Sequence, residues 1–305
     1  MYFRSTMISV LLFTYLSSAA YAKEEVTPSH VYSRALVIKQ VIDTLSKNSK
    51  SNISPIELAD AQPLHVYAIT TALNEKLAIL NVLAGLPSIQ PPAHPGEEIQ
   101  PKHVLKLMNL VQRNLQMLVP DIKFRKKDVV GKRPADVLRI LVSCHLSLDK
   151  LIEEQLTPKY PFLLVSQLKE VLTHAIEQTG HPVPKIPIHL YQGVKPKDVL
   201  VYAENMLKTL MGIAHLKYDV EYPSRPYYTP HDGKYTQPLH VFTVSSMNIV
   251  LLKDFIRRQG LQAHIGSREG ATLVTGTDIT PAHVYALYEE VLYLTSYFII
   301  HTRGD

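Results

Sequence analysis

The chain has 305 residues, with 32 lysines and arginines against 27 aspartates and glutamates, a formal net charge of +5, and one cysteine. The small basic excess is spread along the chain, which argues against a nucleic-acid binder with a concentrated basic face. A single cysteine allows no intrachain disulfide, so the fold must depend on its hydrophobic core.

The first residues, MYFRSTMISVLLFTYLSSAAYA, have the pattern of a secretory signal peptide. Arg4 supplies a positive charge, residues 8–16 are apolar, and residues 20–22 read Ala-Tyr-Ala, a small-x-small cleavage pattern. The apolar stretch is too short to span a bilayer comfortably. We therefore expect residues 1–22 to be removed and the chain from Lys23 onward to be exported to the periplasm or the extracellular space. We expect no transmembrane segment in that mature chain.

One pattern, Pro-x-[His/Asp]-Val followed by a large apolar residue, recurs along the whole chain. Pro158 opens a weaker copy without the valine, and the full pattern begins at Pro28, Pro63, Pro101, Pro134, Pro196, Pro238 and Pro281. Apolar residues follow each proline in the 3-4-3-4 spacing of a helix that packs against other helices. Gly85, Gly180 and Gly260 stand where such a helix would take a left-handed C-cap. The pattern predicts eight helices of about 20 residues, each about 30 Å long.

The eight expected helices divide into two groups of four. The shortest interval between neighbouring prolines separates Pro134 from Pro158, and SPIELADAQP before the second helix resembles IPIHLYQGVKP before the sixth. We therefore predict an all-α repeat protein with two tandem four-helix bundles, residues 23–156 and 157–305, joined internally by long proline-rich connections. A continuous solenoid of single-helix repeats is the alternative. Since the connections can reach back over a whole helix, the sequence leaves parallel and up-and-down arrangements open.

The polar residue of the repeated pattern falls at the third helical position if proline occupies the first. A carboxylate or a neutral imidazole there can accept a hydrogen bond from the backbone N–H before the helix. We interpret seven residues as such helix-start signals: His30, His65, His103, Asp136, Asp198, His240 and His283. A protonated imidazole is disfavoured at the positive end of a helix, so we expect folding to lower the pKa of these histidines. The alternative is a metal site, if parallel helices gather these side chains at one end.

Other candidates for chemistry are few. The chain has no Gly-x-Ser-x-Gly, His-Glu-x-x-His, phosphate-binding Gly-rich or Cys-x-x-Cys motif. We expect Cys144 to be a buried thiol and the adjacent Glu289 and Glu290 to lie in solvent. The connection from residue 217 to 238 is rich in tyrosine, and aromatic and arginine side chains are typical of recognition surfaces. Its candidate binding residues are Tyr222, Arg225, Tyr227, Tyr228 and His231.

These features predict an exported binding or scaffold protein rather than an enzyme, with no cofactor and no metal. Its partner would be a protein or a small molecule that the sequence does not identify. One alternative is a periplasmic ligand-sensing or carrier protein with a pocket between helices. The other is an enzyme that uses histidines and carboxylates in such a cleft.

Overall fold

The computed structural model describes residues 25–46, 61–124, 128–152, 155–218, 236–263 and 278–302, and within these ranges all regular structure is helical. The eight helices are α2 (Pro28–Leu45), α3 (Pro63–Leu83), α4 (Pro101–Leu118), α5 (Pro134–Ile152), α6 (Lys159–Gln178), α7 (Pro196–Tyr218), α8 (Pro238–Arg258) and α9 (Pro281–Thr302). The predicted all-α fold with eight helices is therefore confirmed.

The helix boundaries follow from proline and glycine. Proline is the first residue of every helix except α6, which begins one residue after Pro158. Its fixed φ suits the first turn, where its missing N–H would have no helical partner. Gly85, Gly180 and Gly260 follow the ends of α3, α6 and α8 at φ of 71°, 77° and 76°, a conformation that residues with a Cβ rarely adopt.

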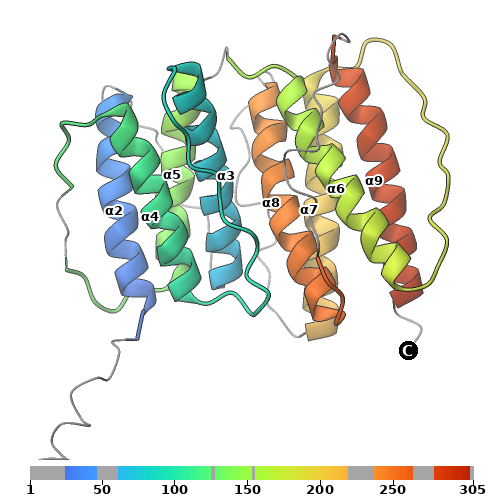
Figure 1. Cartoon of the computed structure of the whole chain (residues 1–305), viewed down its shortest axis with the longest axis horizontal. Helices are drawn as coiled ribbons and strands as arrows, with labels where there is room; N and C mark the ends of the chain where they lie inside the picture. Colours follow the sequence, from blue (N-terminus) through green and yellow to red (C-terminus); the bar gives the residue numbers. More distant parts are fainter. Residues whose placement is uncertain are drawn as a thin grey trace, which may run out of the picture.

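Helices α2–α5 run parallel to one another. Their first-turn prolines line one small pocket together with the valine three residues further on, namely Pro28, Val31, Pro63, Val66, Pro101, Val104, Pro134 and Val137. Four helix starts therefore meet at one end of the group. Figure 1 shows α2–α5 running upward and α6–α9 running downward, so the two groups are opposed. A connection such as residues 84–100 can return because an extended chain of this length reaches about 50 Å, well beyond one helix.

Each helix packs mainly within its own group of four. Both α2 and α3 contact α4 and α5, and in the same way both α6 and α7 contact α8 and α9. The two groups meet where α3 packs against α8, in the middle of the molecule (Figure 1). These two helices are buried on nearly all sides, whereas α4 and α7 each keep an exposed face.

Among the described helices only α8 is long and apolar enough to cross a membrane, and its apolar stretch is entirely buried. A central helix of a large core has the same composition, so its position between α3, α6 and α7 explains its hydropathy.

Candidate functional site

The two central helices carry polar and charged side chains in buried positions. On α3 these include Glu75 and Lys76, and on α8 they include Ser246, Lys253 and Asp254, each less than a tenth exposed. Burying a charge is costly unless it is paired or solvated by other polar groups. The contacts of these residues therefore indicate where the chain departs from simple helix packing.

The segment of residues 86–95 has no regular secondary structure, runs along α3 (Figure 1) and is held by three buried asparagines. The side chain of Asn114 accepts from the backbone N–H of Ile89 (2.9 Å) and donates to its carbonyl (2.8 Å). Asn74 also donates to the carbonyl of Ile89 (3.0 Å), and Asn114 donates to Asn74 (3.0 Å). Asn81 donates to Asn114 in turn (2.9 Å). Because the asparagines satisfy both backbone groups of Ile89, they hold the following residues in place beside α8.

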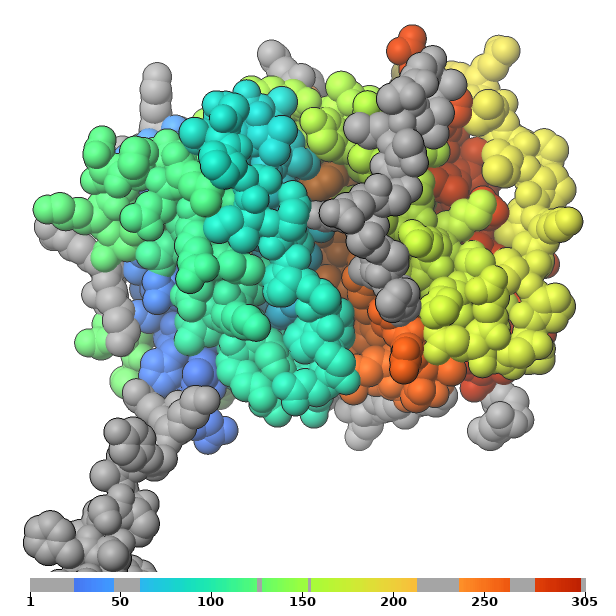
Figure 2. All heavy atoms as spheres, in the orientation of Figure 1, coloured from blue at the N-terminus to red at the C-terminus, as the bar shows by residue number. Residues whose placement is uncertain are grey.

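A cavity of about 330 Å³ lies between α3, α8, this segment and α6. In Figure 2 atoms of α8 are visible between those of the segment after α3 and those of α6. The volume is at the lower end of the range of small-molecule sites. The lining residues come from all four elements: Tyr67, Thr71, Glu75, Gln90, Pro91, Pro92, Ala93, His94, Gln167, Ser246, Ile249, Val250 and Lys253.

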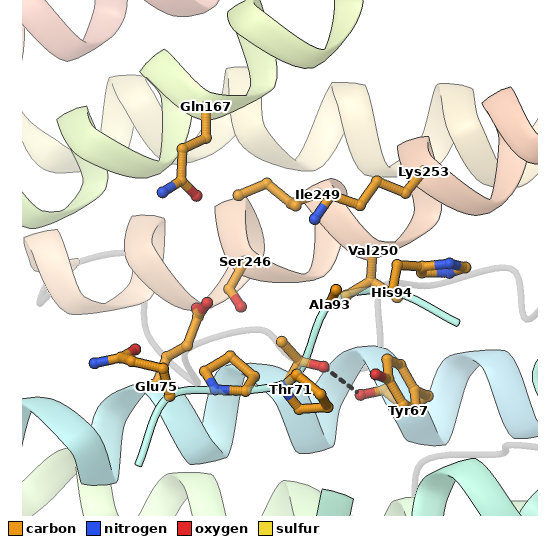
Figure 3. Close-up of a pocket in the computed structure, with 13 residues that line it drawn as sticks. Tyr67, Thr71, Glu75, Ala93, His94, Gln167, Ser246, Ile249, Val250 and Lys253 are labelled. Carbon is orange, nitrogen blue, oxygen red and sulfur yellow. Dashed lines mark hydrogen bonds between the residues drawn. The ribbon is translucent and has the colours of Figure 1, made fainter. Parts of the chain in front are cut away.

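The polar groups of this cavity converge from opposite walls. In Figure 3 the carboxylate of Glu75 extends from α3 toward Ser246, while the side chain of Lys253 extends along α8 toward Gln167 and Ser246. Ser246 is 1% exposed, and its hydroxyl has no hydrogen-bond partner among the described residues. The hydroxyl of Thr71 instead donates to the carbonyl of Tyr67 (3.0 Å). Ser246 is thus a buried polar group that lines the cavity with its hydrogen-bonding capacity unused.

The remaining titratable side chains of the cavity are neutral near pH 7. Burial lowers the pKa of His94 to about 4, against the opposing attraction of Asp254. Burial also raises the pKa of Tyr67 to about 12. The two rings make an edge contact, with centroids 6.2 Å apart. Glu75 and Lys253 are the acidic and the basic side chain among the residues that line this cavity.

The helix-start residues make the backbone hydrogen bonds that the sequence interpretation predicts. In each case the backbone N–H of the residue before the helix donates to the side chain of the third helical residue, over 2.8–3.2 Å. The acceptors are His30, His65, His103, Asp136, Asp198, His240 and His283. Nδ1 of each histidine is occupied in this way. No group of three or more His, Cys, Asp or Glu side chains in the described part of the chain is placed to hold a metal ion.

Burial rather than the helix end is the main cause of the lowered histidine pKa. Burial brings the pKa of His65 to about 3, with a smaller contribution from nearby Arg258. Burial likewise brings the pKa of His240 to about 4, although Asp149 opposes the shift. The burial of α3 and α8 results from tertiary packing, so the sequence predicted only the effect of the positive helix end.

Two expectations about acidic and sulfur side chains have different outcomes. Cys144 is buried as expected, and burial raises the pKa of its thiol. The expectation that Glu290 lies in solvent is wrong, because this residue is buried and its carboxylate lies 2.7 Å from the ammonium of Lys169. The cation comes from α6, which packs against α9 although it lies far from it in the sequence.

The tyrosine-rich binding candidates Tyr222, Arg225, Tyr227, Tyr228 and His231 lie outside the described residues, as does the expected signal peptide. The cavity residues were not predicted from the sequence. A signal for two of them was present, because Glu75 and Lys253 are charged residues within stretches of α3 and α8 that are mostly apolar. Comparison with known proteins finds no matching family model, curated protein or solved structure.

Proposed function

We propose that this chain is an exported binding protein that holds a small molecule in the cavity between α3 and α8. The observation that carries the proposal is a cavity of about 330 Å³ with three buried polar side chains, Glu75, Ser246 and Lys253, on facing walls. Ligand sites commonly combine an apolar lining with a few fixed polar groups of this kind. The carrier or ligand-sensing alternative is thereby favoured over a scaffold.

A binding role is also favoured over catalysis by this cavity. A serine nucleophile needs a base within hydrogen-bond reach, and no described residue hydrogen-bonds to the Ser246 hydroxyl. His94, the histidine that lines the cavity, contacts Tyr67 at the other end. The described residues of the cavity therefore form no serine–base pair of the kind that nucleophilic catalysis needs.

The same proposal includes a tandem duplication, with units at residues 23–156 and 157–305. It is supported by the equivalent neighbours of α2–α5 and α6–α9, and by the repeated sequence pattern. At positions equivalent to Glu75 and Lys253 the other unit has Lys208 and Gln116, so the cavity residues are not part of the common pattern. Duplication would provide the scaffold, and divergence of the two facing helices would provide the site.

Replacing Ser246 with leucine tests the binding function. The extra carbons should fill the cavity, and the removed hydroxyl has no partner to lose among the described residues. We expect native mass spectrometry to show a bound small molecule on the wild type and much less on Ser246→Leu. Ser296→Leu, an exposed serine on α9, is the matched control and should keep the ligand. An equal adduct on all three proteins would contradict this site.

A further inference from the structure

Resting on the proposed binding function, we propose that the cavity takes a small uncharged molecule with a hydroxyl group at each end of an apolar body. One hydroxyl would hydrogen-bond to Ser246, the other would donate to Nε2 of His94, and the body would lie between them.

Antiparallel packing of α3 and α8 places Ser246 at one end of the cavity. His65 at the start of α3 is within electrostatic reach of Arg258 at the end of α8. The cavity residues of α3 run from Tyr67 to Glu75, which is about 12 Å along the helix axis. Ser246 lies beside Glu75 at one end of this stretch (Figure 3).

His94 lies at the other end of the cavity. Its ring makes an edge contact with the ring of Tyr67, with centroids 6.2 Å apart. In Figure 3 Ala93 and Val250 lie between His94 and Ser246. The cavity therefore has a polar group near each end and apolar side chains between them, which fits an elongated ligand with an apolar body.

Both polar groups lack a hydrogen-bond partner among the described residues. This holds for the hydroxyl of Ser246, which is 1% exposed, and for the buried Nε2 of His94. A buried polar atom without a partner destabilises the fold, and a ligand that supplies the hydrogen bond removes that cost. Two such atoms on the wall of one cavity indicate where the polar groups of a ligand would bind.

His94 requires a ligand group that donates a hydrogen bond. Its ring bonds to the backbone of Pro95, and because proline has no N–H, the ring is the donor. Since Nε2 has no partner, the donating nitrogen is Nδ1. Burial lowers the pKa of His94 to about 4, so near pH 7 the ring is neutral and Nε2 is an acceptor. A hydroxyl can donate to this nitrogen, whereas a ketone or ether oxygen cannot.

The cavity wall favours a ligand without charge. Glu75 and Lys253 line the cavity, but each already interacts with other groups of the protein. His94 is neutral near pH 7. An ion that left water for this cavity would lose its hydration without gaining a free counter-charge from these residues.

The test uses the full mature chain, titration calorimetry and five matched probes. Tyrosol, 4-(2-hydroxyethyl)phenol, carries a hydroxyl at each end and no charge. 2-Phenylethanol and 4-ethylphenol each lack one hydroxyl, whereas tyramine and 4-hydroxyphenylacetate carry a charged group in place of the alcohol. We expect tyrosol to bind about tenfold more tightly than either monohydroxyl analogue, as the loss of one buried hydrogen bond implies. It should also bind more tightly than both charged probes.

Two substitutions assign the two hydroxyls to their ends of the cavity. Ser246→Ala should remove the advantage of tyrosol over one monohydroxyl analogue, and His94→Phe should remove its advantage over the other. Ser296→Ala and His189→Phe change an exposed serine and an exposed histidine outside the cavity, and should leave tyrosol binding unchanged. Because Ser246→Ala removes a hydroxyl that has no partner among the described residues, it decides the question even if His94→Phe fails to fold.

Other results overturn the ligand class or the function itself. If tyramine or 4-hydroxyphenylacetate binds as tightly as tyrosol, or if Ser246→Ala leaves tyrosol binding unchanged, the ligand class is wrong and the binding function stands. The same conclusion follows if native mass spectrometry finds a bound molecule that is charged or lacks hydroxyl groups. If no probe binds and the protein from its own source carries no small molecule, the proposed function fails as well.

Discussion

At the scale of single residues, the third position of each helix shows how one structural task accepts two chemistries. His65 and Asp198 occupy equivalent positions and accept the same backbone hydrogen bond, at 2.9 Å and 2.8 Å. The requirement is an acceptor that can reach back over one turn, which neutral imidazole and carboxylate both meet. The hydrogen bond could be predicted from the sequence because its donor and acceptor lie three residues apart.

This interchangeability predicts the effect of substitutions at Asp198. Asp198→Ala removes the acceptor and should lower the free energy of unfolding by about 1 kcal/mol, as loss of a helix-start bond does. Asp198→His should retain more than half of that stability at pH 8, where the imidazole is neutral. Urea unfolding measures both. Equal destabilisation by alanine and histidine would show that the acceptor is not what the position requires.

The buried histidines predict that acid destabilises the fold. The pKa of His65 is about 3 in the folded chain and near 6.5 when unfolded, so below pH 6.5 only the unfolded state takes up the proton. The contribution is complete above pH 6.5 and is lost as the pH falls toward 3. Between pH 7.5 and 5.5, His65→Asn should lose about 1.4 kcal/mol less unfolding free energy than the wild type.

That comparison is internal, because each protein is measured against itself at two pH values. Asparagine keeps a neutral acceptor for the Gln62 N–H but does not titrate. If the unfolding free energies of the two proteins changed equally with pH, this result would contradict the assigned burial of His65.

At the scale of elements, the long connections are structural parts rather than simple links. Residues 86–95 form one wall of the cavity because Asn74 and Asn114 bind both backbone groups of Ile89. The helices themselves could be predicted from local periodicity. The position of this segment could not be predicted in that way. Its hydrogen bonds join Ile89 to Asn74 of α3, 15 positions earlier, and to Asn114 of α4, 25 positions later.

Asn114→Leu should release the segment from α4. The substitution leaves the N–H of Ile89 and the side chains of Asn74 and Asn81 without their partner, so we expect a loss of about 2–4 kcal/mol of unfolding free energy. Hydrogen exchange at the Ile89 amide should accelerate by at least tenfold. Asn205→Leu, on the exposed face of α7, is the control. Unchanged exchange at Ile89 would contradict the anchoring role.

At the scale of the whole molecule, a buried polar cluster lies where the two groups of helices meet. Lys76 of α3 forms an ion pair with Asp149 of α5, and both lie near His240 of α8. His145 of α5 adds a hydrogen bond to the carbonyl of Ile69 (2.9 Å). The sequence predicted two groups of four helices, but it could not predict which helices meet, because the apolar surfaces of α3 and α8 look like ordinary core faces.

Replacing one partner of the ion pair should lower the free energy of unfolding much more than replacing both partners. Lys76→Met leaves a buried carboxylate without its cation and should cost about 3–5 kcal/mol. The double variant Lys76→Met/Asp149→Leu should recover most of this loss. Lys39→Met, which breaks a more exposed pair with Asp43, should cost less than about 1 kcal/mol. Urea unfolding of the wild type and the three variants gives the comparison, and a double variant no more stable than Lys76→Met would contradict it.

Central to the account is that the contact between α3 and α8 creates a ligand site on a helical scaffold. Native mass spectrometry of the protein purified from its own source, with Ser246→Leu beside it, tests this most directly. We expect a chain beginning at Lys23 that carries one small molecule, and we expect this molecule to be absent from Ser246→Leu. A wild type that carries no small molecule would contradict it.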